Sequence, residues 1–106
     1  MIVAFSVSPS GEPQPGHARA EDGSVSEAVA AAVAVVRASG LPHRTGSMFT
    51  EIEGEWDEVF AVVKRATEAV EPFGSRISLV LKADIRPGRS GELEGKVERL
   101  ERTLDE

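Results

Sequence analysis

The stretch RISLVLKADI, residues 76–85, decides the fold class. An apolar residue occupies every second position of this stretch, which is the pattern of a β-strand that packs one face against a core. One row is Ile77, Leu79, Leu81, Ala83 and Ile85, and the other is Ser78, Val80, Lys82 and Asp84. We therefore predict a long strand whose first row packs against helices.

A helix and a hairpin are predicted before this strand. Residues 55–58 (EWDE) place negative charge where the dipole of a starting helix favours it. An apolar stripe at helical spacing follows, until Pro72 and Gly74 end the helix. The stripe is Trp56, Val59, Phe60, Val63, Ala66 and Val70. Upstream, Gly46-Ser47 predicts the turn between a short strand at 43–45 and a strand at 48–53, in which Met48, Thr50 and Ile52 face the core.

The N-terminal part predicts a strand, a loop and a helix. Residues 2–7 read as the first strand, with Val3, Phe5 and Val7 toward the core. Residues 11–23 carry two prolines and three glycines, which predicts a long mobile loop. Ser24-Val25-Ser26-Glu27 has the form of a capping box, and Gly40 stops the helix that it starts. The apolar positions of this helix are Val25, Val29, Ala32, Val33 and Val36.

The predicted order is that of an α+β, ferredoxin-like β-α-β-β-α-β sandwich with a four-stranded antiparallel sheet. A charged C-terminal helix follows, with Leu93, Val97, Leu100 and Leu104 along one side. Right-handed crossovers place the first two helices on one sheet face. The opposite face must then be covered by the terminal helix, another subunit or a ligand.

The composition narrows the class of protein. The 106 residues fit a single domain, with the loop 11–23 inside it. A net charge of −6, with no basic stripe, argues against nucleic acid as a partner. No apolar run is long enough for a membrane span, and no cysteine is present for disulfides or zinc. Without a signal peptide, the expected location is the cytoplasm.

Polar and apolar residues mix on the open sheet face. Ser6 and Ser8 lie there from the first strand, Phe49, Glu51 and Glu53 from the third, and Lys82 and Asp84 from the last. Such a face suggests burial by another subunit with a polar corner near the carboxylates, which Trp56 could border. The simpler alternative is that Glu51–Lys82 and Asp84 form cross-strand ion pairs, and that Trp56 anchors the core.

Five segments along nearly the whole chain together resemble a known family. They are VAFSVS (3–8), TEIEGEW (50–56), VVK (62–64), LVLKADIR (79–86) and KVE (96–98). Their order and spacing resemble the small thiamine-binding, YkoF-like domain proteins. The resemblance implies a ferredoxin-like fold that pairs into dimers with continuous sheets and stacks into homotetramers. It also implies that thiamine or its pyrimidine part binds near subunit interfaces, without catalysis and without a cofactor.

The side chains on the open face are chemically suited to such a ligand. Carboxylates and hydroxyls can pair with an aminopyrimidine, and carboxylates and aromatic rings favour a cationic thiazolium. The expected ligand-binding residues are Ser6, Ser8, Thr45, Phe49, Glu51, Glu53, Trp56, Lys82 and Asp84. Among them, exchange of Glu53 for Gln is expected to weaken thiamine binding.

Three other functions remain open at this point. An enzyme is disfavoured because no nucleophile has a base beside it, although buried paired carboxylates could do acid–base work. A metal site would suit only a hard cation, and no loop has ligand spacing. A homo-oligomeric structural or regulatory module without a small-molecule ligand is the main alternative. The turn at 86–91 could also hold an anion at the N-terminus of the last helix.

Overall fold

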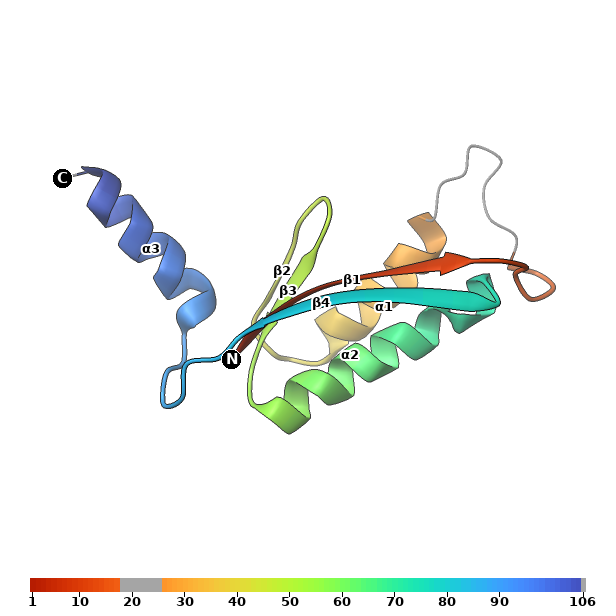
Figure 1. The fold of residues 1–106 in the computed structure, drawn as a ribbon, viewed down its shortest axis with the longest axis horizontal. Helices are drawn as coiled ribbons and strands as arrows, with labels where there is room; N and C mark the ends of the chain where they lie inside the picture. The colour runs from red at the N-terminus through yellow and green to blue at the C-terminus, as the bar shows by residue number, and fades with distance from the viewer. Residues whose placement is uncertain (18–25, 106) are drawn as a thin grey trace.

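The computed structural model describes residues 1–17 and 26–105, and its elements follow the predicted order (Figure 1). They are β1 (Ile2–Ser10), α1 (Ser26–Ala38), β2 (His43–Thr45), β3 (Thr50–Glu53), α2 (Trp56–Val70), the short 3₁₀ helix η1 (Glu71–Phe73), β4 (Arg76–Asp84) and α3 (Glu92–Asp105). The predicted capping residues Ser24 and Val25 lie outside the described residues. Gly40 ends α1 as predicted, with φ at 78° in the left-handed region that glycine tolerates.

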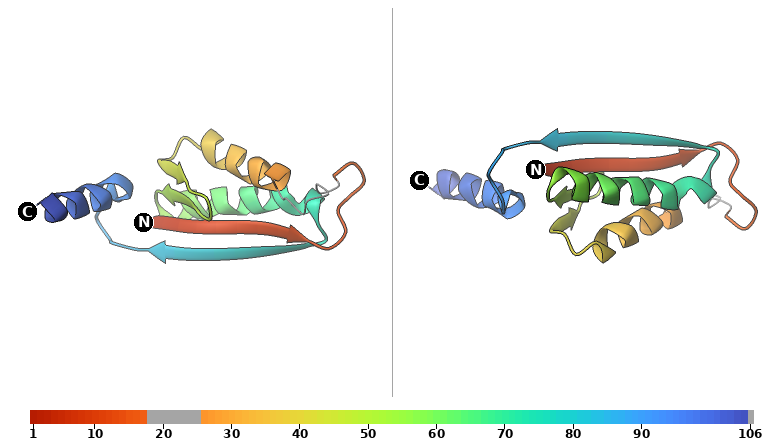
Figure 2. Two further views of the ribbon diagram at one scale, coloured as in Figure 1. Left: turned by 90° about the horizontal axis from the view of Figure 1, so that it is seen from above. Right: turned by 90° about the horizontal axis from the view of Figure 1, so that it is seen from below.

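The four strands form one antiparallel sheet in the order β2-β3-β1-β4. Both α1 and α2 lie on the same face of this sheet (Figure 2). The ferredoxin-like prediction is therefore confirmed. The two central strands are β3 and β1, so β2 and β4 form the outer edges of the sheet.

The core lies between the sheet and the two helices. Its largest fully buried side chains come from both layers and are Ile52, Val3, Val36, Val59 and Val70. The register explains this, because Val3 stands beside Ile52 on one side and Ala83 on the other, all in the helix-facing row. Each buried valine or isoleucine stabilises the fold by about 1.5–3 kcal/mol relative to an exposed one.

The hairpin between β2 and β3 is wider than predicted. The backbone amide of Gly46 donates to the carbonyl of Phe49 at 2.9 Å, so residues 46–49 together make the turn. Consequently β3 begins only at Thr50, and the predicted core position of Met48 is wrong: its side chain is 77% exposed. Phe49 also lies in the turn rather than in the strand.

Three other positions predicted to be in the core are exposed. Trp56 is 54% exposed and stacks on Phe60 with ring centroids 5.1 Å apart, because it is the first residue of α2 and precedes the buried part of the stripe. Ile85 is exposed because β4 ends at Asp84. Leu79 faces the helices by register, yet it is half-exposed because β4 is an outer strand.

The described part of the predicted loop, residues 11–17, runs along η1. The amide of Gln14 donates to the carbonyl of Pro72 at 2.8 Å, and the ring of His17 meets that of Phe73 edge-on at 5.2 Å. The predicted loop residues 18–23 lie outside the described residues.

α3 is attached to the sheet through its first turn. The buried carboxylate of Glu53, at the end of β3, accepts hydrogen bonds from the backbone amides of Glu92 (2.8 Å) and Leu93 (3.2 Å). It satisfies amides that have no partner within the helix, and its charge faces the positive end of the helix dipole. The place where an anion was considered is therefore taken by the protein's own carboxylate.

An ion pair with β4 adds to this attachment, and a second ion pair lies within α3, at its attached first turn. Lys96 of α3 pairs with Asp84 of β4, and Arg99 donates to Glu92 at 2.5 Å. The hydrogen bond and the charge of Lys96 lower the pKa of Asp84. The hydrogen bond from Arg99 likewise lowers the pKa of Glu92.

Beyond its first turn, α3 extends away from the sheet, next to the N-terminus (Figures 1 and 2). Leu93 is buried, whereas Val97, Leu100 and Leu104 are exposed. The terminal helix therefore leaves the open face of its own sheet uncovered. That face has no cover from the described residues of this chain.

Removing the Glu53 carboxylate should loosen α3. Glu53→Ala leaves two amides without an acceptor in a buried place, which costs about 1–3 kcal/mol, and Glu53→Gln loses the charge that faces the dipole. We expect faster amide hydrogen exchange in the first turn of α3 in both variants, with β1 unchanged. Glu51→Gln is the matched control, because Glu51 lies in the same strand and makes no hydrogen bond or ion pair with the described residues of α3. Unchanged exchange at Glu92 and Leu93 in Glu53→Ala would contradict the assigned cap.

Acid should weaken the same attachment. Because folding lowers the pKa of Asp84 and Glu92, their contribution is complete above their ordinary values of 3.8 and 4.5. It is lost as pH falls from those values through the lowered ones. Hydrogen exchange of α3, corrected for the intrinsic pH dependence, should therefore accelerate below about pH 4.5. Lys96→Met should flatten the part of this dependence that belongs to Asp84.

Candidate functional site

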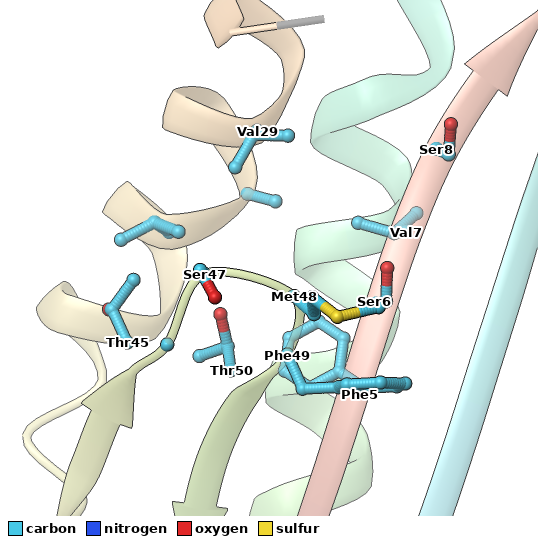
Figure 3. A pocket seen from close by; sticks show the side chains of 13 residues that line it. Phe5, Ser6, Val7, Ser8, Val29, Thr45, Ser47, Met48, Phe49 and Thr50 are labelled. Carbon is cyan, nitrogen blue, oxygen red and sulfur yellow. The ribbon is translucent and has the colours of Figure 1, made fainter.

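A cavity of about 230 Å³ opens where β3 and β1 separate (Figure 3). We call it the β1-edge cavity. Its walls are the second half of β1, the β2–β3 hairpin tip and one side of α1. The lining residues are Phe5, Ser6, Val7, Ser8, Val29, Ala32, Val33, Thr45, Gly46, Ser47, Met48, Phe49 and Thr50.

The cavity exists because the two neighbours of β1 differ in length. β4 pairs with β1 from Ile2 to Ser10, whereas β3 pairs with it only from Ile2 to Phe5. Beyond Phe5 the hairpin turns away from β1, as Figure 1 shows. α1 then closes the helix side of the gap, which explains why Val29, one of the predicted apolar positions of this helix, is 41% exposed.

Hydroxyl groups and apolar groups share the lining. Both rows of β1 reach the cavity, Phe5 and Val7 from the helix face and Ser6 and Ser8 from the open face. In Figure 3 the hydroxyls of Ser47 and Thr50 point toward one another at the hairpin tip. None of the described residues that line the cavity carries a charge. The cavity is thus suited to a neutral, flat group with several hydrogen-bonding atoms.

The structure brings four of the nine predicted site residues together in this cavity. They are Ser6, Ser8, Thr45 and Phe49. The remaining five are Glu51, Glu53, Trp56, Lys82 and Asp84, and none of them lines it. The single polar corner predicted from the open face is therefore divided in two.

Two of the predicted carboxylates have structural partners on α3. Glu53 caps the helix and Asp84 pairs with Lys96. Glu51 and Lys82 are both in register with Ala4 but on opposite sides of it, so the alternative of a direct cross-strand pair is wrong. Glu51 lies in β3, two residues after Phe49 of the turn, and makes no ion pair with a described residue.

A second cavity, of about 340 Å³, lies at the root of α3. It is lined by Pro42, His43, Glu53, Gly91, Leu93 and Glu94. Of the nine predicted residues it contains only Glu53, whose oxygens are already bonded to the helix. It therefore offers a ligand fewer free polar groups than the β1-edge cavity.

Several lining residues were not predicted, among them Val7, Ser47 and Thr50. One signal for them was present in the sequence: Pro9 stands inside a strand. Proline lacks the amide hydrogen that a ladder needs, so within a sheet it indicates a place where the regular ladder on that side of the strand is interrupted. Among residues 1–17 and 26–105, no group of three or more His, Asp or Glu could hold a metal ion, and no helix could span a membrane.

Known proteins resemble this chain over nearly its whole length. A UPF0045 protein of Mycobacterium bovis is 47% identical over 98% of this chain and 94% of its own length. A UPF0045 protein of Synechocystis is 40% identical over 77% of this chain and 69% of its own length. A domain of unknown function from Bacillus cereus has a TM-score of 0.75 at 30% identity, covering 92% of this chain and 86% of that one. A Thermotoga maritima structure, named a candidate thiamine biosynthesis/salvage protein, has a TM-score of 0.69 at 26% identity. The match covers 92% of this chain and 97% of that one. The profile of the thiamine-binding proteins matches residues 3–101, and the chain belongs to that family.

Proposed function

We propose that this protein binds thiamine, or its free aminopyrimidine, in the β1-edge cavity and does not transform it. The observation that supports this most directly is the uncharged, hydroxyl-rich lining beside Phe5 and Phe49. An aminopyrimidine is flat and neutral, and it offers donors and acceptors that hydroxyls and backbone groups can meet. Membership of the thiamine-binding family points to the same ligand.

The size of the cavity favours one ring rather than the whole ligand. Its 230 Å³ equal the volume of roughly seven or eight waters, below the range of about 300–1,000 Å³ for sites that enclose drug-sized ligands. The pyrimidine would occupy it, and the thiazolium would lie at the mouth beside Met48. Glu51, two residues after Phe49 and without an ion pair to a described residue, is the predicted carboxylate best placed to favour that positive charge.

The same lining argues against tight binding of the diphosphate through its phosphates. Recognition of a phosphate group usually relies on arginine, lysine or a helix N-terminus. Among the described residues, the β1-edge cavity has no basic side chain, and the N-terminus of α3 is capped by Glu53. We therefore propose that the pyrimidine ring, which all these forms share, is the recognised part.

Calorimetry with thiamine and with the free pyrimidine tests this proposal. We expect a dissociation constant of about micromolar, which is roughly −8 kcal/mol. Phe49→Ala should weaken binding about tenfold, because a ring stacked on an aromatic side chain contributes ~1–2 kcal/mol. Trp56→Ala is the control, since this exposed ring lies outside the cavity, and it should bind as the unchanged protein does. Absence of heat with either ligand, or equal losses in the two variants, would refute binding in this cavity.

A homo-oligomeric module without a small-molecule ligand is the second candidate. It is favoured by the exposed stripe Val97, Leu100 and Leu104, and by the free outer edge of β4. Both would be covered in a dimer or tetramer of this chain. A native mass spectrum distinguishes the candidates: an oligomer whose mass and stability do not respond to thiamine supports assembly alone.

A further inference from the structure

We propose that the backbone of Val7, the first β3-facing residue of β1 beyond the β3 ladder, recognises the hydrogen-bonding edge of the ligand's pyrimidine. Its amide would donate to a ring nitrogen, and its carbonyl would accept from the neighbouring exocyclic amine. This inference rests on the proposed function, and it names how that site achieves specificity without a charged side chain.

The register fixes which way each backbone group of β1 points. The amide of Gly54 donates to the carbonyl of Met1 at 3.1 Å, and the amide of Glu53 donates away from β1, to Pro42, at 2.9 Å. In an antiparallel ladder, residues alternate between the two neighbours. Odd-numbered residues of β1 therefore point toward β3, and even-numbered residues point toward β4.

Val7 is the odd-numbered residue that follows the last pair of the β3 ladder. That pair joins Phe5 to Thr50. If β3 continued, Met48 would stand opposite Val7, but Met48 lies in the hairpin turn and is exposed. By this register the amide and the carbonyl of Val7 point away from the β4 ladder, and no backbone hydrogen bond outside the ladders joins them to a described residue. Val7 itself lines the cavity.

Pro9 supports this orientation independently. It is the next odd-numbered residue of β1, so its nitrogen, which carries no hydrogen, is not one that the ladder with β4 needs as a donor. Its side chain is buried with those of Val3, Phe5 and Val7, in the row that the register predicts.

Pro9 also limits what can bind to this edge. An added strand would draw on a donor at every second residue, but the edge beyond Phe5 offers one amide, at Val7, and none at Pro9. A peptide would therefore gain little from pairing here. A small heterocycle with one adjacent acceptor and donor uses all that the edge offers, and the 230 Å³ cavity admits one ring.

Amide hydrogen exchange on the unaltered protein is the first test. In the free protein Ser6 and Ser8 should be protected by the β4 ladder, and Val7 should exchange quickly. Free aminopyrimidine at ~100 times its dissociation constant should slow exchange at Val7 by about 100-fold. If the pyrimidine binds and Val7 still exchanges quickly, this inference is wrong while the proposed function stands. If no pyrimidine binds, both are wrong.

A double-mutant cycle is the second test. Val7→Pro removes the amide, and Val7→Ala keeps it while trimming the same buried side chain. Losing one neutral hydrogen bond should weaken pyrimidine binding about three- to tenfold in Val7→Pro relative to Val7→Ala. The second ligand is an analogue with CH in place of the ring nitrogen next to the amine. Val7→Ala should bind this analogue less well than the parent pyrimidine, whereas Val7→Pro should bind the two equally well. The matched control is an analogue in which CH replaces the other ring nitrogen instead. Equal losses for the analogue in both variants would overturn the assignment.

Discussion

The arrangement of this molecule depends on the unequal pairing of one strand. β1 is hydrogen-bonded along its whole length to β4 but along only four residues to β3. The ladder with β4 holds the second half of β1 straight, so the departure of the hairpin leaves a gap in the sheet rather than a bend. α1 covers that gap on one side, and the result is a cavity with backbone, hydroxyl and aromatic groups around it.

The carboxylates of the open face serve a different purpose from the cavity. Glu53 and Asp84 hold the root of α3, and their partners are a helix end and a lysine within the same chain. With 18 acidic against 12 basic residues and a net charge of −6, the chain has acidic side chains for such internal contacts. The site is consequently neutral, although acidic composition alone would suggest a charged one.

The fold could be predicted from the sequence because its signals are local and strong. The alternation in residues 76–84, the stop at Gly40 and the acidic start of α2 each act within a few residues. The site was predicted only in part, since alternation sorts side chains by face but says nothing of where one strand leaves another. Met48 illustrates this: the period of two placed it in the core, and the wider turn placed it at the cavity mouth. A second reason is that some partners lie far apart in the sequence: the amides that Glu53 binds lie 39 and 40 residues further along the chain.

Pro9 has a further consequence for the behaviour of the protein in a crowded cell. A sheet with a gap exposes unpaired backbone, and unpaired backbone invites aggregation through strand addition. Proline in that position interrupts the template after a single amide, so the opening can stay unfilled without recruiting another copy into a fibril. The residue that would help to shape the proposed binding edge would thereby also protect that edge against strand addition.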